Sequence, residues 1–69
     1  MSMRKLASIH DNYTNGNKRD CVKEIDNYGS ADFFSDFRIY LYEMYCGDYK
    51  TQHKLFTDMT ISYFRFKQL

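Results

Sequence analysis

The chain has 69 residues, with ten basic and nine acidic side chains and a formal net charge of +1. A chain of this length forms one domain, residues 1–69, that buries only about 60% of its unfolded surface. The nearly balanced charge argues against the strongly basic surface that binds nucleic-acid phosphates. Seven Tyr and six Phe are too many for so small a core, so we expect some rings to be exposed at interfaces.

The sequence has no apolar N-terminal run of the secretory type, and no apolar run near the ~20 residues that span a bilayer. Two cysteines, Cys21 and Cys46, form no recognisable disulfide framework. We therefore expect a cytoplasmic protein in which both thiols are reduced and packed.

The first predicted helix covers residues 3–13, with Ser2 as its N-cap and Gly16 as its stop signal. Its apolar stripe consists of Leu6, Ile9 and Tyr13. The second covers residues 18–28, between an N-cap at Asn17 and a stop at Gly29. Its buried face consists of Cys21, Val22, Ile25 and Tyr28. The connection to the next helix is so short that it predicts a hairpin or a tight corner.

The third predicted helix, residues 31–46, has the widest apolar face and should be the central wall of the fold. Ser30 is its predicted N-cap, and Gly47 is its stop. Large apolar side chains recur along it every three or four residues, as on one side of a helix. They are Phe33, Phe34, Phe37, Tyr40, Leu41, Met44 and Tyr45.

The fourth predicted helix covers residues 50–66, with Asp48 as its N-cap. Its apolar face consists of Leu55, Phe56, Met59, Tyr63 and Phe66. Residues 60–67 are also rich in aromatic and β-branched side chains that alternate as in a strand. We favour a helix there because no other segment supplies a partner strand. The predicted fold is an all-α bundle of three to four short helices.

Four side chains have the composition of a Cys₂His₂ metal site, namely His10, Cys21, Cys46 and His53. Structural zinc sites use close pairs of ligands, whereas Cys46 and His53 are seven positions apart and the other two residues are distant in the sequence. The spacing therefore favours packed cysteines and surface histidines, and we expect no metal and no cofactor.

The sequence also gives little evidence for catalytic groups. A Cys/His nucleophile pair is formally possible, but so small a bundle has little room for a pocket and an oxyanion hole. The carboxylates of Asp32, Asp36 and Glu43 fit a solvated helix face better than a buried acid–base pair. We expect a protein that is not an enzyme.

Aromatic side chains that lie off the predicted core faces suggest a protein-binding surface instead. The candidate contact residues are Ile39, Tyr42, Tyr49, Phe64 and Arg65. A second copy of the chain could cover Ile39 and Tyr42, so a homodimer is also expected. The alternative is a small nucleic-acid-binding regulator, since the last segment interleaves rings with cations. Its basic residues would be Lys50, Lys54, Arg65 and Lys67.

Three runs of sequence resemble short uncharacterised reading frames of tailed phages, including phages of marine cyanobacteria. They are residues 12–20 (NYTNGNKRD), 32–37 (DFFSDF) and 59–65 (MTISYFR). The resemblance implies a small protein that binds a host protein in the host cytoplasm and modulates or inhibits it. It brings no catalytic residues with it.

Overall fold

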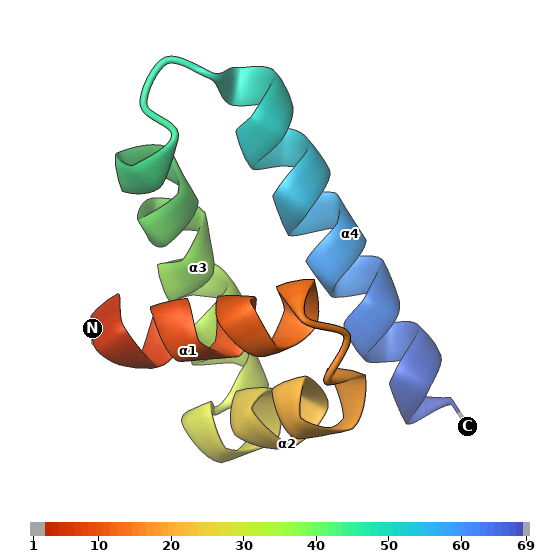
Figure 1. Ribbon diagram of the computed structural model, residues 1–69. Coiled ribbons are helices and arrows are strands. Elements are labelled where there is room, and N and C mark those ends of the chain that lie inside the picture. Colours follow the sequence, from red (N-terminus) through yellow and green to blue (C-terminus); the bar gives the residue numbers. More distant parts are fainter. Residues whose placement is uncertain (1–2, 69) are drawn as a thin grey trace.

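The computed structural model of the chain describes residues 3–68, which form four helices (Figure 1). They are α1 (Met3–Thr14), α2 (Lys18–Tyr28), α3 (Ser30–Met44) and α4 (Tyr49–Lys67). The described part of the chain contains no strand, so the predicted all-α bundle is confirmed, as is a helix over residues 60–67. The predicted cap Ser2 lies outside the described residues.

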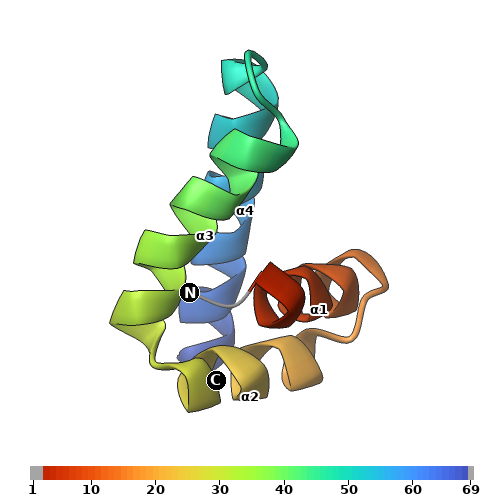
Figure 2. The same cartoon turned by 90° about the vertical axis from the view of Figure 1, so that its left-hand side faces the viewer.

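Helices α3 and α4 form an antiparallel hairpin, and α1 and α2 pack across the half of it that is farther from its loop (Figures 1 and 2). The α3–α4 loop and the helix turns next to it project beyond α1 and α2 in both views. As a result, the hairpin has one half that is supported by the other two helices and one half that is not.

The turn between α1 and α2 closes α1 through backbone hydrogen bonds. The Gly16 N–H donates to the Tyr13 carbonyl at 3.1 Å, and the Asn17 N–H donates to the Asn12 carbonyl at 2.8 Å. This pair of bonds is a Schellman motif, and it requires the φ of +83° that Gly16 adopts. Asn17 does precede α2 as predicted, but its side chain makes no capping hydrogen bond. The predicted role of Asn17 as a side-chain cap is therefore wrong.

The corner between α2 and α3 depends on a single residue, Gly29, with φ +99° and ψ +109°. Its N–H donates to the Ile25 and Asp26 carbonyls at 3.0 and 3.2 Å, and its carbonyl accepts from the Phe33 N–H at 2.7 Å. Gly29 thus ends α2 and begins α3. Ser30, the predicted N-cap, is instead the first residue of α3, because a one-residue connection leaves no place for a separate cap.

Asp48 caps α4 as predicted. Its carboxylate accepts hydrogen bonds from the Thr51 N–H at 3.1 Å and from the Thr51 hydroxyl at 2.6 Å. The hydroxyl bond is the larger of the two causes that hold the pKa of Asp48 below its usual value. Helix α3 ends at Met44, two residues earlier than predicted, because the Asp48 N–H closes the loop on the Tyr45 carbonyl at 2.9 Å.

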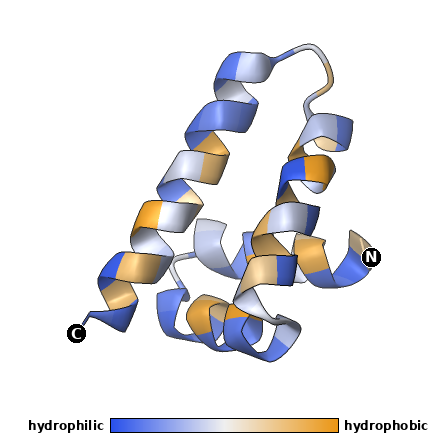
Figure 3. Cartoon of the chain, turned by 180° about the vertical axis from the view of Figure 1, so that it is seen from behind, coloured by the Kyte–Doolittle hydropathy of each residue, from blue (hydrophilic) through white to orange (hydrophobic). Residues whose placement is uncertain are grey.

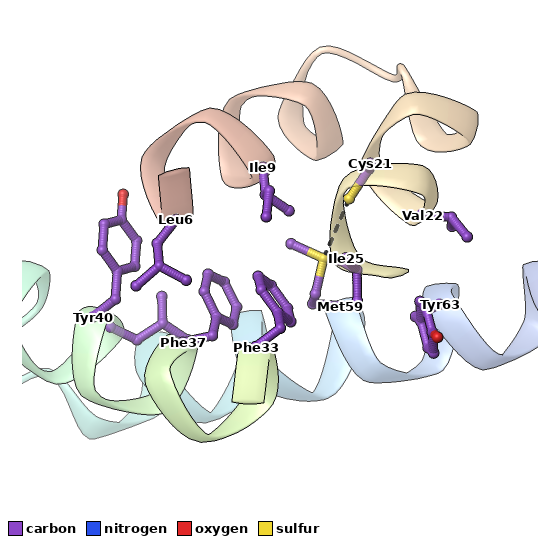
Figure 4. Close-up of a cluster of buried hydrophobic side chains, with 11 residues drawn as sticks. Leu6, Ile9, Cys21, Val22, Ile25, Phe33, Phe37, Tyr40, Met59 and Tyr63 are labelled. Carbon is purple, nitrogen blue, oxygen red and sulfur yellow. Dashed lines mark hydrogen bonds between the residues drawn. The ribbon is translucent and has the colours of Figure 1, made fainter. Parts of the chain in front are cut away.

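Helix α3 supplies the aromatic centre of the core, as the sequence predicts (Figure 4). The rings of Phe33 and Phe37 stack with centroids 5.0 Å apart, and those of Phe37 and Tyr40 stack at 5.7 Å. Leu6 and Ile9 of α1 are fully buried in the same cluster. The remaining buried hydrophobic residues are Cys21, Val22, Ile25, Leu41, Met59 and Tyr63.

Two apolar residues that the sequence assigns to the core lie in solvent. Met44 is 57% exposed, because it lies in the last turn of α3, beyond the part of the hairpin that α1 and α2 cover. Cys46 is exposed in the α3–α4 loop, so the expectation that both thiols are packed is wrong for this one. Cys21 is buried, and its Sγ lies 3.7 Å from the Met59 Sδ. Burial, with a smaller effect of Glu24, raises the pKa of Cys21 to about 11.

His10 is half-buried rather than on the surface, which corrects a second expectation. Its ring meets the rings of Phe37 and Tyr40 edge-on, at centroid distances of 5.8 and 6.0 Å. Burial lowers the pKa of His10, and the charge of Asp11 acts in the opposite direction. His10 is therefore part of the packing between α1 and α3.

Three carboxylates accept hydrogen bonds from neighbouring helices. Asp26 of α2 accepts hydrogen bonds from the Tyr63 hydroxyl at 2.5 Å and from the Lys67 ammonium at 2.9 Å, both on α4. Asp36 of α3 accepts from the Tyr28 hydroxyl of α2 at 2.5 Å, so its expected solvated role is corrected. Ser8 and Asn12 of α1 donate to Glu24 of α2. These contacts fix how the helices are oriented on the core.

Replacing Gly29 by Ala should lower the free energy of unfolding by about 1–3 kcal/mol. The added methyl group would meet Asp32 at an ordinary distance of 3.7 Å, so the cost comes from the backbone angles. Thermal or urea unfolding followed by circular dichroism measures the change. Ser35→Ala, at an exposed position of α3, is the control and should stay within about 0.5 kcal/mol of wild type. Equal stability of Gly29→Ala and wild type would contradict this account of the corner.

Replacing Asp26 by Asn should destabilise the fold at neutral pH but not in acid. The hydrogen bond from Tyr63 is the main cause that lowers the pKa of Asp26, and Lys67 adds to it. A carboxyl group with a lowered pKa stabilises the fold fully above its unfolded pKa of about 3.9. This stabilisation is lost as the pH falls below that value and through the lower pKa of the folded state. Because Asp26 is exposed, we expect less than about 1 kcal/mol at neutral pH.

Urea unfolding at several pH values measures this difference between wild type and Asp26→Asn. Tyr63→Phe removes one of the two donors and should reproduce part of the effect. A stability difference that is the same in acid as at neutral pH would show that the loss does not come from the charge of Asp26.

Candidate functional site

A hollow with a volume of about 390 Å³ lies on the surface between α3 and α4. We call it the α3–α4 groove. Helix α3 contributes Arg38, Leu41 and Tyr42 to its lining. Helix α4 contributes Tyr49, Gln52, His53 and Phe56. Figure 3 shows the α3–α4 hairpin from behind, with hydrophobic and hydrophilic segments interleaved along both helices.

Two contacts hold the walls of the groove in place. The Arg38 guanidinium lies over the Phe56 ring, 4.7 Å from its centroid, in a cation–π contact between α3 and α4. The Gln52 side chain donates a hydrogen bond of 2.6 Å to the Tyr45 carbonyl next to the loop. Each contact joins α4 to α3 or to the residue that follows α3, so the groove is formed before any partner binds.

The apolar surface continues from the groove toward the C-terminal end of α4. Phe34 meets Phe56 edge-on with a centroid distance of 6.0 Å, and it stacks on Phe64 at 6.3 Å. Phe64 is 53% exposed, so this row of rings is open to solvent at its end. The row runs along the side of the hairpin that carries Arg38 and Phe56.

The groove is positively charged at Arg38, with His53 as a second basic group, and none of its seven lining residues is acidic. Lys67 and Asp26 form an ion pair that does not involve Arg38, and no carboxylate of the described residues pairs with Arg38. Its guanidinium is held by an aromatic ring and keeps its full charge for another molecule.

The structure brings some of the predicted contact residues together and separates others. Tyr42 and Tyr49 line the groove from opposite helices and are 52% and 67% exposed. Phe64 belongs to the adjoining row of rings. Ile39 is exposed but lines no part of the groove, and neither does Arg65. These two predicted residues are therefore not part of this site.

Sequence reasoning assigns none of four groove residues to a binding surface, namely Arg38, Gln52, His53 and Phe56. It also misses Phe34, which belongs to the adjoining row of rings. Phe34, Arg38 and Tyr42 are spaced at i, i+4 and i+8 along α3, which places them in one row on the helix. This spacing could have revealed the row. The row is not evident from the sequence because Phe34 and Phe56 also fit the predicted core stripes. Arg38 by itself is expected to be an ordinary solvent-exposed charge.

The basic residues proposed for nucleic-acid binding do not form one cluster. Lys67 is paired with Asp26. It borders a different hollow of about 330 Å³ together with Arg19 and Lys23 of α2. Lys50 and Lys54 lie near the opposite end of α4 from Lys67. The structure thus offers Arg19 and Lys23, which the sequence does not single out, as the cationic neighbours of Lys67.

The four residues with the composition of a metal site do not meet. Within residues 3–68, no three or more His, Cys, Asp or Glu side chains come together as metal ligands. His10 and Cys21 face the core, whereas Cys46 and His53 are exposed. Residues 3–68 also contain no helix with the length and apolar character needed to cross a bilayer.

Comparison with known proteins gives no relative for this chain. No protein-family model, no curated protein and no solved structure matches it. Function must therefore be argued from the groove itself.

Replacing Tyr49 by Ser should change the free energy of unfolding by no more than about 0.5 kcal/mol, because its side chain lies mostly in solvent. Phe37→Ala, in the buried ring stack, should cost about 3–5 kcal/mol. Urea unfolding of both variants makes the comparison. A large loss for Tyr49→Ser would mean that the rim of the groove supports the fold and is not a free surface.

Proposed function

We propose that this chain is a non-enzymatic protein-binding module that uses the α3–α4 groove as its contact surface. The observation that carries the proposal is that two exposed tyrosines, Tyr42 and Tyr49, lie at a largely apolar groove between α3 and α4. Tyrosines and arginines are the side chains that most often dominate binding energy at protein interfaces. Tyr42, Tyr49 and Arg38 meet that description in this groove.

The rings at this surface are ready to bind. Phe56 and Phe34 are already packed between α3 and α4, so little side-chain freedom is lost when a partner covers them. Rings exposed to water carry an unfavourable free energy of hydration, and binding of a partner removes their apolar surface from water. The groove volume also lies within the range of about 300–1,000 Å³ that is usual for binding pockets.

The resemblance to short tailed-phage reading frames supports a host protein as the partner, in the host cytoplasm. A small module that covers part of a host protein can modulate or inhibit it by excluding that protein's own partners. The likeness to these reading frames supports the class of partner, whereas the groove supports the mode of binding.

The alternative function, a small nucleic-acid-binding regulator, has one observation in its favour. Arg19, Lys23 and Lys67 border one hollow, although Asp26 pairs with the last of them. Binding of this kind would be electrostatic and would weaken steeply with salt. A homodimer that covers Ile39 and Tyr42 also stays a prediction, and light scattering at several concentrations tests it.

Capture of partners from host lysate tests the proposal. The wild-type chain should retain a defined protein, and the double variant Tyr42→Glu/Tyr49→Glu should lose it, because two charges would be placed at the rim of an apolar groove. Ile61→Glu is the matched control, since Ile61 is 48% exposed and lies outside the groove lining. Circular dichroism should show the same helicity in all three proteins.

Two results would count against this function. One is retention of the same protein by the double variant. The other is strong binding of the chain to random-sequence DNA or RNA at low salt that disappears as salt rises, which would favour the alternative.

A further inference from the structure

We infer that the occupant of the α3–α4 groove is a peptide segment of another protein that carries an Asp or Glu beside its largest apolar side chain, with Arg38 as the group that pairs with this carboxylate. The inference rests on the proposed function and specifies the chemistry of the partner. It follows from the charge, the lining and the symmetry of the groove.

The charge of the groove calls for a carboxylate. Arg38 is the charged residue of its lining, which contains no acidic side chain that would neutralise this charge. The Arg38 guanidinium is held 4.7 Å from the Phe56 centroid, so its position is set before binding. A pre-positioned guanidinium binds a carboxylate with two parallel hydrogen bonds and loses little freedom in doing so.

The lining calls for an apolar anchor next to that carboxylate. Leu41 and Phe56 form apolar walls of the groove, and the rings of Tyr42 and Tyr49 extend these walls at the two sides. The volume of about 390 Å³ is large enough for an aromatic or large aliphatic side chain. Because Arg38 packs directly on Phe56, the carboxylate and the anchor must be neighbours in the bound segment.

Symmetry disfavours a second copy of the chain as the occupant. A two-fold interface centred on the groove would bring Arg38 of one protomer close to Arg38 of the other. These two like charges would repel each other. Two hollows facing one another would also leave the aromatic walls uncovered. A segment with an acidic and an apolar side chain provides both a negative charge for Arg38 and an apolar group that covers the aromatic walls.

Selection from a random peptide library displayed on a carrier tests the inference. The immobilised wild-type chain should enrich peptides that carry Asp or Glu adjacent to an aromatic or large aliphatic residue. Arg38→Glu should abolish this enrichment and favour Lys or Arg at the same position. Peptides selected on wild type should bind Arg38→Glu at least about tenfold more weakly, which corresponds to about 1.4 kcal/mol.

Two further variants make the result interpretable. Arg4→Glu makes the same charge change at an exposed position of α1 and should select acidic peptides as wild type does. Arg38→Gln removes the charge without reversing it and should lose the acidic preference without gaining a basic one. Thermal unfolding of each variant checks that the bundle is intact, since the two Arg38 variants also lose the cation–π contact with Phe56.

Each other outcome overturns the inference. These are failure to enrich any peptide, enrichment without a carboxylate, the same acidic preference on Arg38→Glu, or a concentration-dependent dimer that Arg38→Glu disrupts. A protein captured from lysate together with no acidic preference in the library would leave the proposed function in place and remove this inference. Selection of acidic peptides without capture of any protein from lysate would support the peptide chemistry of the groove and count against the proposed function.

Discussion

The ring stack of α3 is the interaction on which the rest of the structure depends. Phe33, Phe37 and Tyr40 lie parallel along one side of the helix, and α1, α2 and α4 all pack against α3. In so short a chain the core is marginal, and large rings supply buried area with little loss of side-chain entropy. Because α1 and α2 both pack on this face of α3, they cannot also cover the opposite side of the hairpin.

Polar contacts between helices make this arrangement specific. A hydrophobic stack by itself tolerates several helix orientations, whereas a hydroxyl–carboxylate bond has one geometry. Tyr63 with Asp26 fixes α4 on α2, and Tyr28 with Asp36 fixes α2 on α3. The one-residue corner at Gly29 sets where α2 stops and α3 starts. Together they determine which rings of α3 and α4 face inward and which remain at the groove.

The groove follows from a difference in length between the two layers. Helices α1 and α2 have 12 and 11 residues, whereas α3 and α4 have 15 and 19. The longer hairpin therefore projects past its support (Figures 1 and 2). At the groove, Phe56 packs against both the core and Arg38. A preformed surface with unpaired positive charge and exposed tyrosines results. We regard this projecting half as the part of the molecule that is available for function.

The sequence by itself determined the four helices, the cap at Asp48 and the α3 ring face, because these depend on residues within a few positions of one another. Only the tertiary structure decided that Met44 is exposed, that His10 is half-buried and that Ser30 is not a cap. The site divides in the same way. Exposed tyrosines could be predicted from helix periodicity, but their meeting with Arg38 across two helices depends on how α3 and α4 are aligned. That alignment is set by contacts between residues far apart in the chain, which local patterns do not record.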